Sequence, residues 1–374
     1  MTARLDTEVA IIGGGIGACS AALHLARRGV PALVLERDYA GAGASGVNFG
    51  GVRRNGRHLE ELALAERALS GYWRRLEEWV GSTCEYAETG HLKCARNAED
   101  AAELERHNAK AQDYGVPLEM LGRSELLERF PWLGPDAYAA SWSPTCGQAN
   151  PRLVGPAFAR AARAAGAEIR ERVRVVGAET IGSGFEIATE DGLSVRARVL
   201  LNCAGAWGAE VAAWFNERVP MRTITPQMVV TEPLPYVIEP VLGVVGGNLY
   251  LRQIPRGNVI FGGGDGVADL AAARSYVAPP ATLESLRHAV RMVPHLARAH
   301  VIRVWTGLEG ETPDGLPILG PSATTAGLFH SFGYSGHGFQ LVPAAGAILA
   351  ELVCEGATQT PIAPLAISRF RPAS

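Results

Sequence analysis

A glycine-rich turn at residues 13–18 has the residue types and spacing of a phosphate-binding loop. It joins the apolar run 9–12 to a helical run that ends at Gly29. In such a turn the first glycine permits a sharp reversal, the third residue lets the backbone approach a pyrophosphate, and the final alanine lets a helix pack closely against a strand. The first amides of the helix would face the phosphates with the positive end of the helix dipole. The residues expected there are Gly13, Gly15, Ile16, Gly17 and Ala18.

A carboxylate stands at the far end of the same unit. A second apolar run, residues 32–35, ends in Glu36 and Arg37, and Glu36 lies 23 residues after Gly13. A carboxylate at the end of the second strand of a βαβ unit can accept hydrogen bonds from ribose hydroxyls. Strand, glycine turn, helix, strand and acid occur together in the required order. We therefore predict a dinucleotide site here, rather than a glycine turn that is only structural.

Arginines follow this unit closely. Residues 38–51 are mostly glycine and other small residues, which is typical of a loop lying against a ligand, although a flexible surface loop has the same composition. The basic cluster Arg53, Arg54, Arg57 and His58 comes directly afterwards. Charge clusters are often simply solvated. Because this one follows a loop suited to a ligand, we predict that one of its arginines faces the active site.

Composition describes a globular protein with more than one domain. The 374 residues exceed the ~100–200 usual for one domain, and 47% of them are apolar. A net charge of −3 gives no reason to expect nucleic acid or an anionic membrane as a partner. The six cysteines lack metal-ligand spacing, so no metal site is predicted. The first apolar run is too short to span a membrane and lacks the features of a signal peptide, so a cytoplasmic protein is expected.

Changes of pattern predict an α/β fold, α+β overall, in which an antiparallel-sheet substrate domain is inserted into a Rossmann-like domain. Periodicity predicts one helix over residues 59–80, a hairpin strand at 193–196 and a separate buried strand from residue 199 to 202. The expected Rossmann-like, cofactor-binding domain comprises residues 1–83, 146–222 and 305–374, and the expected substrate domain comprises residues 84–145 and 223–304.

Four motifs occur in the order found in the D-amino acid oxidase superfamily. They are the glycine turn with Glu36 and Arg37, the strand end at residues 202–207, the Thr-Pro-Asp run at 312–320 and the Ser-Gly-His-Gly-Phe loop at 335–339. The chain resembles this superfamily over essentially its whole length. It is most similar to the branch containing monomeric sarcosine oxidase, glycine oxidase, the sarcosine oxidase β subunit and D-hydroxyproline dehydrogenases. The resemblance implies FAD as cofactor and oxidation of an amine or amino acid.

The resemblance also implies where FAD is bound. Glu36 and Arg37 would hold the ADP half together with the glycine turn, and the backbone of Val173 or Val175 would meet the adenine. The loop before the last long helix would lie beside the flavin pyrimidine ring, where its amides stabilise negative charge on the reduced flavin. The remaining expected cofactor residues are Ser45, Gly46, Asn48, Gly50, Gly51, Cys203, Ala204, Gly205, Trp207, Gly307, Gly333, Gly336, His337, Gly338, Phe339 and Gln340.

Three positions depart from the pattern of the sarcosine oxidases. The cysteine that attaches flavin there corresponds to about Gly307 here, so FAD should be non-covalent. The lysine that helps to bind the substrate carboxylate corresponds to Gln340. The lysine that activates oxygen falls near Val259 and Ile260, where this chain has no lysine. We therefore expect weaker oxygen reactivity, and we expect more of the carboxylate binding to fall on arginine.

The implied reaction requires a group that binds the substrate carboxylate more than it requires a general base. The α-carbon hydrogen would leave as a hydride to flavin N5 from the neutral amine, so correct placement of the substrate is the main requirement. An arginine fork pairs bidentately with a carboxylate. Arg54 is the first choice for this role, with Arg53 and Arg252 as alternatives. Tyr250 either lines the pocket or is a core aromatic, and His337 is either an acid–base group or structural.

Two functions remain open from the sequence. The favoured one is oxidation of a small secondary amine or amino acid, such as sarcosine, iminodiacetate, D-proline or D-hydroxyproline, to the imine, with O2 reduced to H2O2. The alternative is a D-amino acid or D-hydroxyproline dehydrogenase, or a subunit like the sarcosine oxidase β subunit, that passes electrons to a quinone or a partner subunit. A flavin-binding subunit without activity is a third and weaker interpretation.

Overall fold

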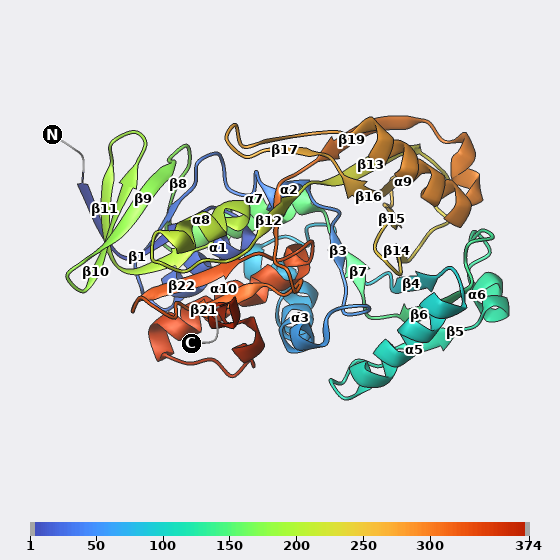
Figure 1. The fold of residues 1–374 in the computed structure, drawn as a ribbon, viewed down its shortest axis with the longest axis horizontal. Coiled ribbons are helices and arrows are strands. Elements are labelled where there is room, and N and C mark those ends of the chain that lie inside the picture. The colour runs from blue at the N-terminus through green and yellow to red at the C-terminus, as the bar shows by residue number, and fades with distance from the viewer. Residues whose placement is uncertain (1–3, 371–374) are drawn as a thin grey trace.

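Two eight-stranded sheets organise the structure, a computed structural model that describes residues 4–370. The sheets lie in two lobes along the long axis of the molecule (Figure 1). Strands of the first sheet come from residues 4–35, 168–202 and 318–332, and those of the second come from residues 91–143 and 226–306. The chain therefore leaves the first lobe and returns to it twice. The predicted domain boundaries fall between these groups of strands, and their placement stays a prediction.

The first sheet is built on the βαβ unit. β1 pairs in parallel with β2 and β11, so Ile12 lies beside both Leu35 and Asn202 where the three strands end. Every residue of β2 is buried, since the sheet is covered on both faces and needs apolar residues on both. The strands in sheet order are β21 (Ile318–Pro321), β22 (Leu328–Phe332), β11 (Ser194–Asn202), β1 (Arg4–Ile12), β2 (Ala32–Leu35) and β8 (Glu168–Arg170), with β10 (Gly184–Thr189) on β11 and β9 (Val175–Ile181) on β10.

Helices α1 (Ile16–Arg27) and α10 (Gly338–Glu355) pack together beside this sheet. A Cβ atom on Gly346 would lie 2.6 Å from the carbonyl oxygen of Gly17, so the two backbones approach closely through glycine. By length and composition α10 is apolar enough to cross a membrane, but 61% of it is buried within the fold, as in the core helix of a soluble protein. α7 (Pro151–Ala164) packs on α1, and α3 (Leu62–Gly71) packs on α10.

The second sheet is antiparallel except where β4 and β14 run in parallel. In β4, Leu92 and Cys94 belong to the core on one side of the sheet, so the alternate residues His91 and Lys93 face the other side. α9 (Pro279–Met292) contacts β16. The strands in sheet order are β19 (Val301–Thr306), β13 (Pro226–Pro233), β16 (Asn258–Asp265), β15 (Tyr250–Gln253), β14 (Val241–Val244), β4 (His91–Ala95), β6 (Ala139–Ser143) and β5 (Glu119–Leu121).

Shorter elements complete the two lobes. Three strand pairs stand apart from the large sheets: β3 (Gly51–Val52) with β7 (Gly147–Gln148), β12 (Arg222–Ile224) with β20 (Glu309–Glu311), and β17 (Val267–Asp269) with β18 (Arg274–Tyr276). The remaining helices are α2 (Ala44–Val47), α4 (Leu76–Val80), α5 (Ala98–Gln112), α6 (Arg123–Arg129) and α8 (Gly208–Ala213), with 3₁₀ turns at Leu59–Glu61, Trp73–Arg75, Gly205–Trp207, Pro294–Arg298, Ala363–Leu365 and Ile367–Phe370.

Two predicted elements differ from the structure. Residues 59–80 form two helices and two 3₁₀ turns instead of one helix, and the break at Tyr72 accompanies burial of the adjacent Trp73, whose indole N–H donates to the carbonyl of Gln340 at 2.8 Å. The two strands predicted between residues 193 and 202 are one continuous strand, β11, because it pairs with β1 along its whole length. In both elements, contacts with residues that are distant in sequence determine the observed structure.

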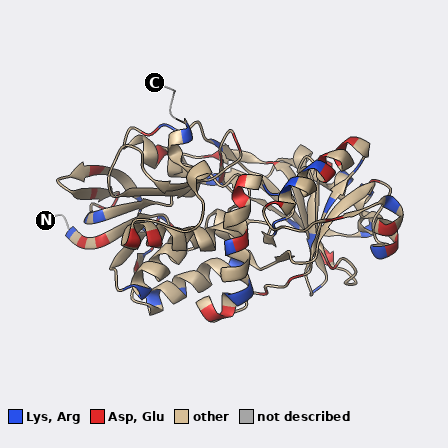
Figure 2. Cartoon of the chain, turned by 90° about the horizontal axis from the view of Figure 1, so that it is seen from below, with Lys and Arg blue, Asp and Glu red and all other residues tan. Residues whose placement is uncertain are grey.

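Charged residues do not collect on one face. Figure 2 shows Lys and Arg interspersed with Asp and Glu on both lobes in this view. This distribution agrees with the small net charge of −3.

Candidate functional site

A cavity of about 1320 Å³ lies between the two lobes. The glycine turn after β1, the small-residue loop, the turn after β11 and the loop before α10 form its first-lobe walls, and strands β4, β14 and β15 contribute from the second lobe. Most of the residues predicted to hold a cofactor line it. They are Gly13, Gly15, Gly17, Ala18, Glu36, Arg37, Ser45, Asn48, Gly50, Gly51, Val173, Val175, Cys203, Ala204, Gly205, Trp207, Gly307, Gly333, Gly336, His337, Gly338 and Phe339.

Three of the predicted cofactor residues do not line the cavity. Ile16 is buried, although its amide donates to Ser45 Oγ at 3.0 Å and so joins the small-residue loop to the start of α1. A Cβ atom on Gly46 would lie 2.3 Å from the carbonyl of Gly41, which makes this glycine a close-packing position. The side chain of Gln340 is buried and donates to the carbonyl of Ala65 at 2.8 Å. A contact of these residues with the cofactor stays a prediction.

The turn after β1 holds a carboxylate at the cavity wall. Gly13 has a φ of +98°, and a Cβ atom there would lie 2.5 Å from the carbonyl oxygen of Cys203, so only glycine fits. Glu36 accepts hydrogen bonds from the backbone amides of Gly14 and Asp38. Burial raises the pKa of Glu36, while these two amide hydrogen bonds oppose that change. The carboxylate is thus positioned where a ribose hydroxyl could donate to it.

A cation–π contact lies beside the carboxylate of Glu36. The guanidinium carbon of Arg37 lies 3.3 Å from the ring centre of Trp207, at the turn that follows β11. Val173 and Val175 line the same end of the cavity, as the resemblance implied for the adenine. The cavity therefore offers a flat, partly apolar surface next to a carboxylate, which suits an adenosine group.

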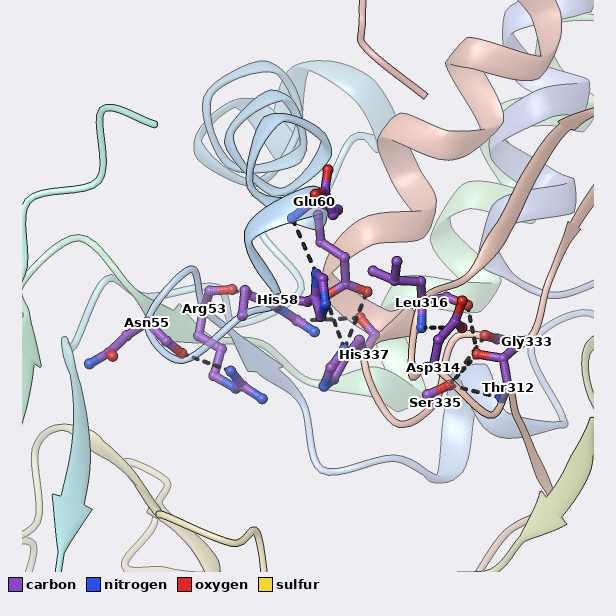
Figure 3. Close-up of polar contacts among 12 residues, drawn as sticks. Arg53, Asn55, His58, Glu60, Thr312, Asp314, Leu316, Gly333, Ser335 and His337 are labelled. Carbon is purple, nitrogen blue, oxygen red and sulfur yellow. Dashed lines mark hydrogen bonds and ion pairs between the residues drawn. The ribbon is translucent and has the colours of Figure 1, made fainter. Parts of the chain in front are cut away.

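Two loops are tied together at the opposite end of the cavity. The amide of Thr312 donates to Ser335 Oγ at 3.2 Å, and Thr312 Oγ1 donates to the carbonyl of Leu316 at 2.7 Å. Asp314 Oδ1 accepts from the amide of Leu316 at 3.1 Å, which closes the turn (Figure 3). The tie between Thr312 and Ser335 holds the glycine loop, which leads into α10, against the Thr-Pro-Asp turn. The amides of the first turn of that helix can then stabilise negative charge.

His337 forms a hydrogen-bonded pair with the buried Glu61 at this junction. Its Nδ1 donates to Glu61 at 3.0 Å, and Glu61 is fully buried. Burial and Arg57 lower the pKa of His337 to about 4, whereas the positive charges of its surroundings lower the pKa of Glu61 despite its burial. Histidine is therefore neutral and glutamate is ionised near pH 7. This arrangement favours the structural role over the acid–base role for His337.

Neighbouring arginines point in different directions. Arg53 lines the cavity, and one of its nitrogens donates to the carbonyl of Asn55 at 2.7 Å (Figure 3). Arg54 does not line the cavity, because its guanidinium pairs with Glu66 and donates to Thr145 Oγ1 at 2.7 Å. The geometry thus does not support Arg54 as the substrate anchor. It brings Arg53 to the site.

Arg57 lines the same part of the cavity. It donates to the carbonyls of Arg53 at 3.1 Å and His337 at 3.3 Å. Its Nη1 atom is buried and has no hydrogen-bond partner in residues 4–370. Glu61 provides the negative charge that acts on it. An unpaired donor of this kind, aimed at a loop where a cofactor ring is expected, is consistent with a ligand that accepts a hydrogen bond.

The second sheet supplies the remaining wall. In β15, Tyr250 lines the cavity, and its hydroxyl donates to the carbonyl of Gln227 at 3.1 Å, so the phenol lies across the sheet as a wall. Its ring centre is 4.9 Å from that of Phe49. Arg252 does not line the cavity; it donates to Gln148 Oε1 at 2.8 Å. Of the three arginines proposed as anchors, only Arg53 reaches the cavity.

Sequence reasoning missed several titratable residues of the cavity wall, among them His91, Lys93 and Glu309. The alternation of His91 and Lys93 with the core residues Leu92 and Cys94 could have shown that the first two face away from the core. Glu309 precedes the Thr-Pro-Asp run, and burial raises its pKa to about 7. No local pattern marks Glu309 as a cavity residue.

These residues fit FAD. The glycine cradle, the carboxylate of Glu36 and the Arg37–Trp207 stack suit the ADP half, and the glycine loop at the start of α10 suits the ring that carries the chemistry. A dinucleotide-binding lobe built on a mixed sheet with a parallel centre, together with a second, mostly antiparallel sheet that closes the cavity, defines a two-lobed flavin-dependent oxidoreductase. The chain belongs to the DAO family, because the family model described as FAD dependent oxidoreductase matches residues 8–352.

Comparison with individual proteins agrees with this class. A glycine oxidase from Geobacillus kaustophilus (strain HTA426) is 30% identical over 377 residues, which cover 99% of this chain and 98% of the relative. The crystal structure of L-proline dehydrogenase from P. horikoshii has a TM-score of 0.90 and 27% identity, with 98% of each chain covered. That of an iminodiacetate oxidase from Chelativorans sp. BNC1 has a TM-score of 0.83 and 26% identity, covering 96% of this chain and 98% of the other. This chain is thus an FAD-dependent enzyme that oxidises an amino acid or amine.

Proposed function

We propose that the enzyme oxidises a small secondary amino acid, of the N-substituted glycine or cyclic imino acid type, and that Arg53 binds the substrate carboxylate. The observation that carries this proposal is the position of Arg53. It lies in the cavity wall, forms no ion pair with any carboxylate of residues 4–370, and keeps donors beyond the one used by Asn55. A guanidinium of this kind suits a planar carboxylate.

The remaining residues orient and enclose the substrate. Tyr250 and Phe49 form an aromatic wall that suits the carbon skeleton of a small amino acid. The neutral His337 and the ionised Glu61 hold the glycine loop in place without placing an acid next to the substrate amine. FAD, when bound, supplies a two-electron acceptor. The amino acid loses a hydride from its α-carbon and a proton from its nitrogen, which forms the C=N bond of the imine.

The electron acceptor that ends the cycle is the second part of the proposal. We propose O2, which takes up two electrons and two protons to give H2O2. A dehydrogenase that passes electrons to a quinone or a partner subunit is the alternative. One observation favours this alternative: β16, where the oxygen-activating lysine of the sarcosine oxidases would fall, contains no lysine. A relative of the same fold is named a dehydrogenase.

The test is turnover by the purified chain alone in air. Sarcosine, iminodiacetate, D-proline and D-hydroxyproline are supplied in turn, and oxygen uptake and peroxide are measured together. The proposal predicts one H2O2 for each amino acid oxidised with at least one of these substrates. Turnover only when an artificial electron acceptor is added would decide for the dehydrogenase. Preference for a primary amine without a carboxylate would overturn the assignment of Arg53.

A further inference from the structure

One end of the cavity carries more positive charge than one substrate carboxylate neutralises. Arg53, Arg57 and Lys93 all line it. Glu61 faces Arg57 and provides one negative charge. Glu61 also acts on Arg53, and the exposed Glu103 acts on Lys93, but no carboxylate of residues 4–370 lies within ion-pair distance of Arg53 or Lys93. An amino acid with a single carboxylate would leave one of them unpaired, and an unpaired buried charge is unfavourable.

Lys93 is held in a defined place by its packing. A Cβ atom added to Gly56 would lie 3.4 Å from Lys93 Cδ and Cε, and one added to Gly243 would lie 3.8 Å from Cδ. The aliphatic part of the lysine therefore lies between the sheet and the loop that carries Arg53 and Arg57. Lys93 lines the cavity, and no hydrogen-bond partner for its ammonium group is found among the described residues.

The sheet leaves room beside Lys93. Gly243 of β14 is paired with Lys93 of β4 on one side and with Tyr250 of β15 on the other. Neighbouring strands are about 4.8 Å apart, so roughly 9–10 Å separate the backbones of Lys93 and Tyr250. Gly243 lines the cavity, and since glycine has no side chain, β14 places none between the cation and the aromatic wall; His91 and Lys93 border this floor. A small, elongated molecule can lie there with one end at Lys93.

Lys93 is a rare residue type in this chain and stands among arginines in the cavity wall. The chain has 35 Lys and Arg residues, and only Lys93 and Lys110 are lysines. The lysine in the cavity differs chemically from its arginine neighbours, because it can lose its proton when no anion is present. Burial and Arg53 lower the pKa of Lys93 to about 7. A bound anion would raise this pKa again and would be held by a full charge.

We infer that Lys93 forms a second carboxylate subsite, and that the preferred substrates are secondary amino acids with two carboxylates, of which iminodiacetate is the smallest. This inference rests on the proposed function. Arg53 binds the carboxylate next to the carbon that is oxidised, and Lys93 binds the distal one across Gly243. His91, whose Nε2 would lie 3.4 Å from a Cβ atom on Gly243, bounds the subsite on the same strand as Lys93.

The experiment compares one-carboxylate and two-carboxylate ligands in the FAD-loaded enzyme. Values of kcat/KM are measured for iminodiacetate and sarcosine. Dissociation constants are measured from changes in the flavin absorption spectrum for two unreactive analogues, thiodiacetate and (methylthio)acetate. The wild type should prefer the two-carboxylate member of each pair by at least about tenfold. Lys93→Met should weaken thiodiacetate by roughly 30-fold or more and leave (methylthio)acetate within about threefold.

Two further variants make the test specific. Lys110→Met removes the other lysine, which lies in the last turn of α5 outside the cavity, and should change none of these values. Lys93→Arg restores the positive charge and should recover much of the preference, whereas a purely packing role would not be rescued in this way. Flavin content reports on folding, and Lys93→Gln replaces the methionine variant if that one fails to bind FAD.

The outcomes separate the inference from the proposed function. If sarcosine and iminodiacetate react equally well, or if Lys93→Met weakens both analogues alike, the subsite is absent while the oxidation of secondary amino acids stands. If Lys93→Met changes only the rate at which air reoxidises the flavin, the inference is also wrong. If no amino acid is oxidised but thiodiacetate binds through Lys93, the subsite stands and the proposed function fails.

Discussion

Arg53 and Lys93 are two cations whose surroundings give them different properties. Arg53 keeps its charge at any physiological pH and offers a rigid fork of donors, whereas Lys93 carries a compact charge that burial makes easy to lose. Neither has an ion-pair partner within residues 4–370. Arg54, by contrast, is satisfied by Glu66 and Thr145. At the scale of single residues, the lack of an ion-pair partner is the reason we propose Arg53 and Lys93 as ligand-binding groups.

Replacing Arg53 by methionine tests the anchor. Loss of one partner of a desolvated charge pair costs about 3–5 kcal/mol, so kcat/KM should fall on the order of 10²–10³, mainly through KM. FAD content should stay that of the wild type. Arg54→Met is the matched control: it should lower thermal stability by breaking the Glu66 pair and leave kcat/KM near the wild-type value. The reverse result, with Arg54→Met inactive and Arg53→Met unaffected, would restore Arg54 as the anchor.

Replacing Lys93 by methionine also changes how stability depends on pH. The pKa of Lys93 is about 7 in the folded chain, against about 10.4 for an unperturbed lysine. Between these values the unfolded chain binds the extra proton, so the contribution of Lys93 to stability rises with pH. Below about pH 7 the full penalty of burying the ammonium is present.

Lys93→Met should therefore be more stable than the wild type at about pH 6, and this advantage should shrink toward about pH 9. Denaturant titrations of the substrate-free proteins at both pH values give the two differences in free energy of unfolding. An advantage that is the same at both pH values, or larger at the higher one, would show that the amine is not buried as described.

At the scale of elements, the turn between β1 and α1 positions the cofactor side of the cavity. Its glycines let the strand reverse, Glu36 accepts from the backbone amides of Gly14 and Asp38, and Ser45 fixes the start of the helix from the next loop. α10 is held against α1 through Gly17 and Gly346, which places the glycine loop at the opposite end. Two helix starts thus face one cavity from the same lobe.

Gly13→Ala should abolish FAD binding. The new methyl group would lie 2.5 Å from the carbonyl oxygen of Cys203, in a backbone conformation that L-residues rarely adopt. The ratio of flavin to protein absorbance measures the effect, and circular dichroism checks the fold. Gly29→Ala is the control, since Gly29 also has a positive φ, of +73°, but has open space around it. Equal flavin contents in the two variants would show that the close approach to β11 is unimportant.

Short-range sequence patterns predicted the elements that depend little on contacts with distant residues. The βαβ unit, the hairpin turn and the long C-terminal helix follow from short-range periodicity and glycine positions, and most cofactor residues follow with them. The direction in which Arg54 points could not be predicted, because it depends on Glu66 in the following helix, 12 residues along, and on Thr145, which is 91 residues away. Lys93 was missed because its cavity is formed only when β4 pairs with β14.

At the scale of the whole molecule, the site exists only between two lobes that are each incomplete. The first lobe supplies the cofactor walls and the arginine loop, and the second supplies Lys93, Tyr250 and the floor at Gly243. Because the chain crosses between the lobes several times, their relative position is fixed by covalent connections as well as by packing. Partner subunits, an expectation from the resemblance, stay a prediction.

The cofactor should be held without a covalent bond. Among the described residues, Cys203 is the cysteine that lines the cavity, and burial raises its pKa to about 12, so it stays a protonated and weakly nucleophilic thiol. Gly307 occupies the position of the flavin-attaching cysteine of the sarcosine oxidases. Precipitation with acid should therefore release all of the flavin into the supernatant. Yellow colour that stays in the washed pellet would contradict this prediction.

The central claim is that bound FAD is reduced by a small secondary amino acid held by Arg53. Anaerobic mixing of the wild-type holoenzyme with sarcosine, iminodiacetate, D-proline and D-hydroxyproline measures this step without any electron acceptor. At least one of them should bleach the visible absorption of the flavin in a single exponential phase, and Arg53→Met should need far more of the same substrate. Flavin that stays oxidised with all four, or that is bleached equally by amines without a carboxylate, would contradict the claim.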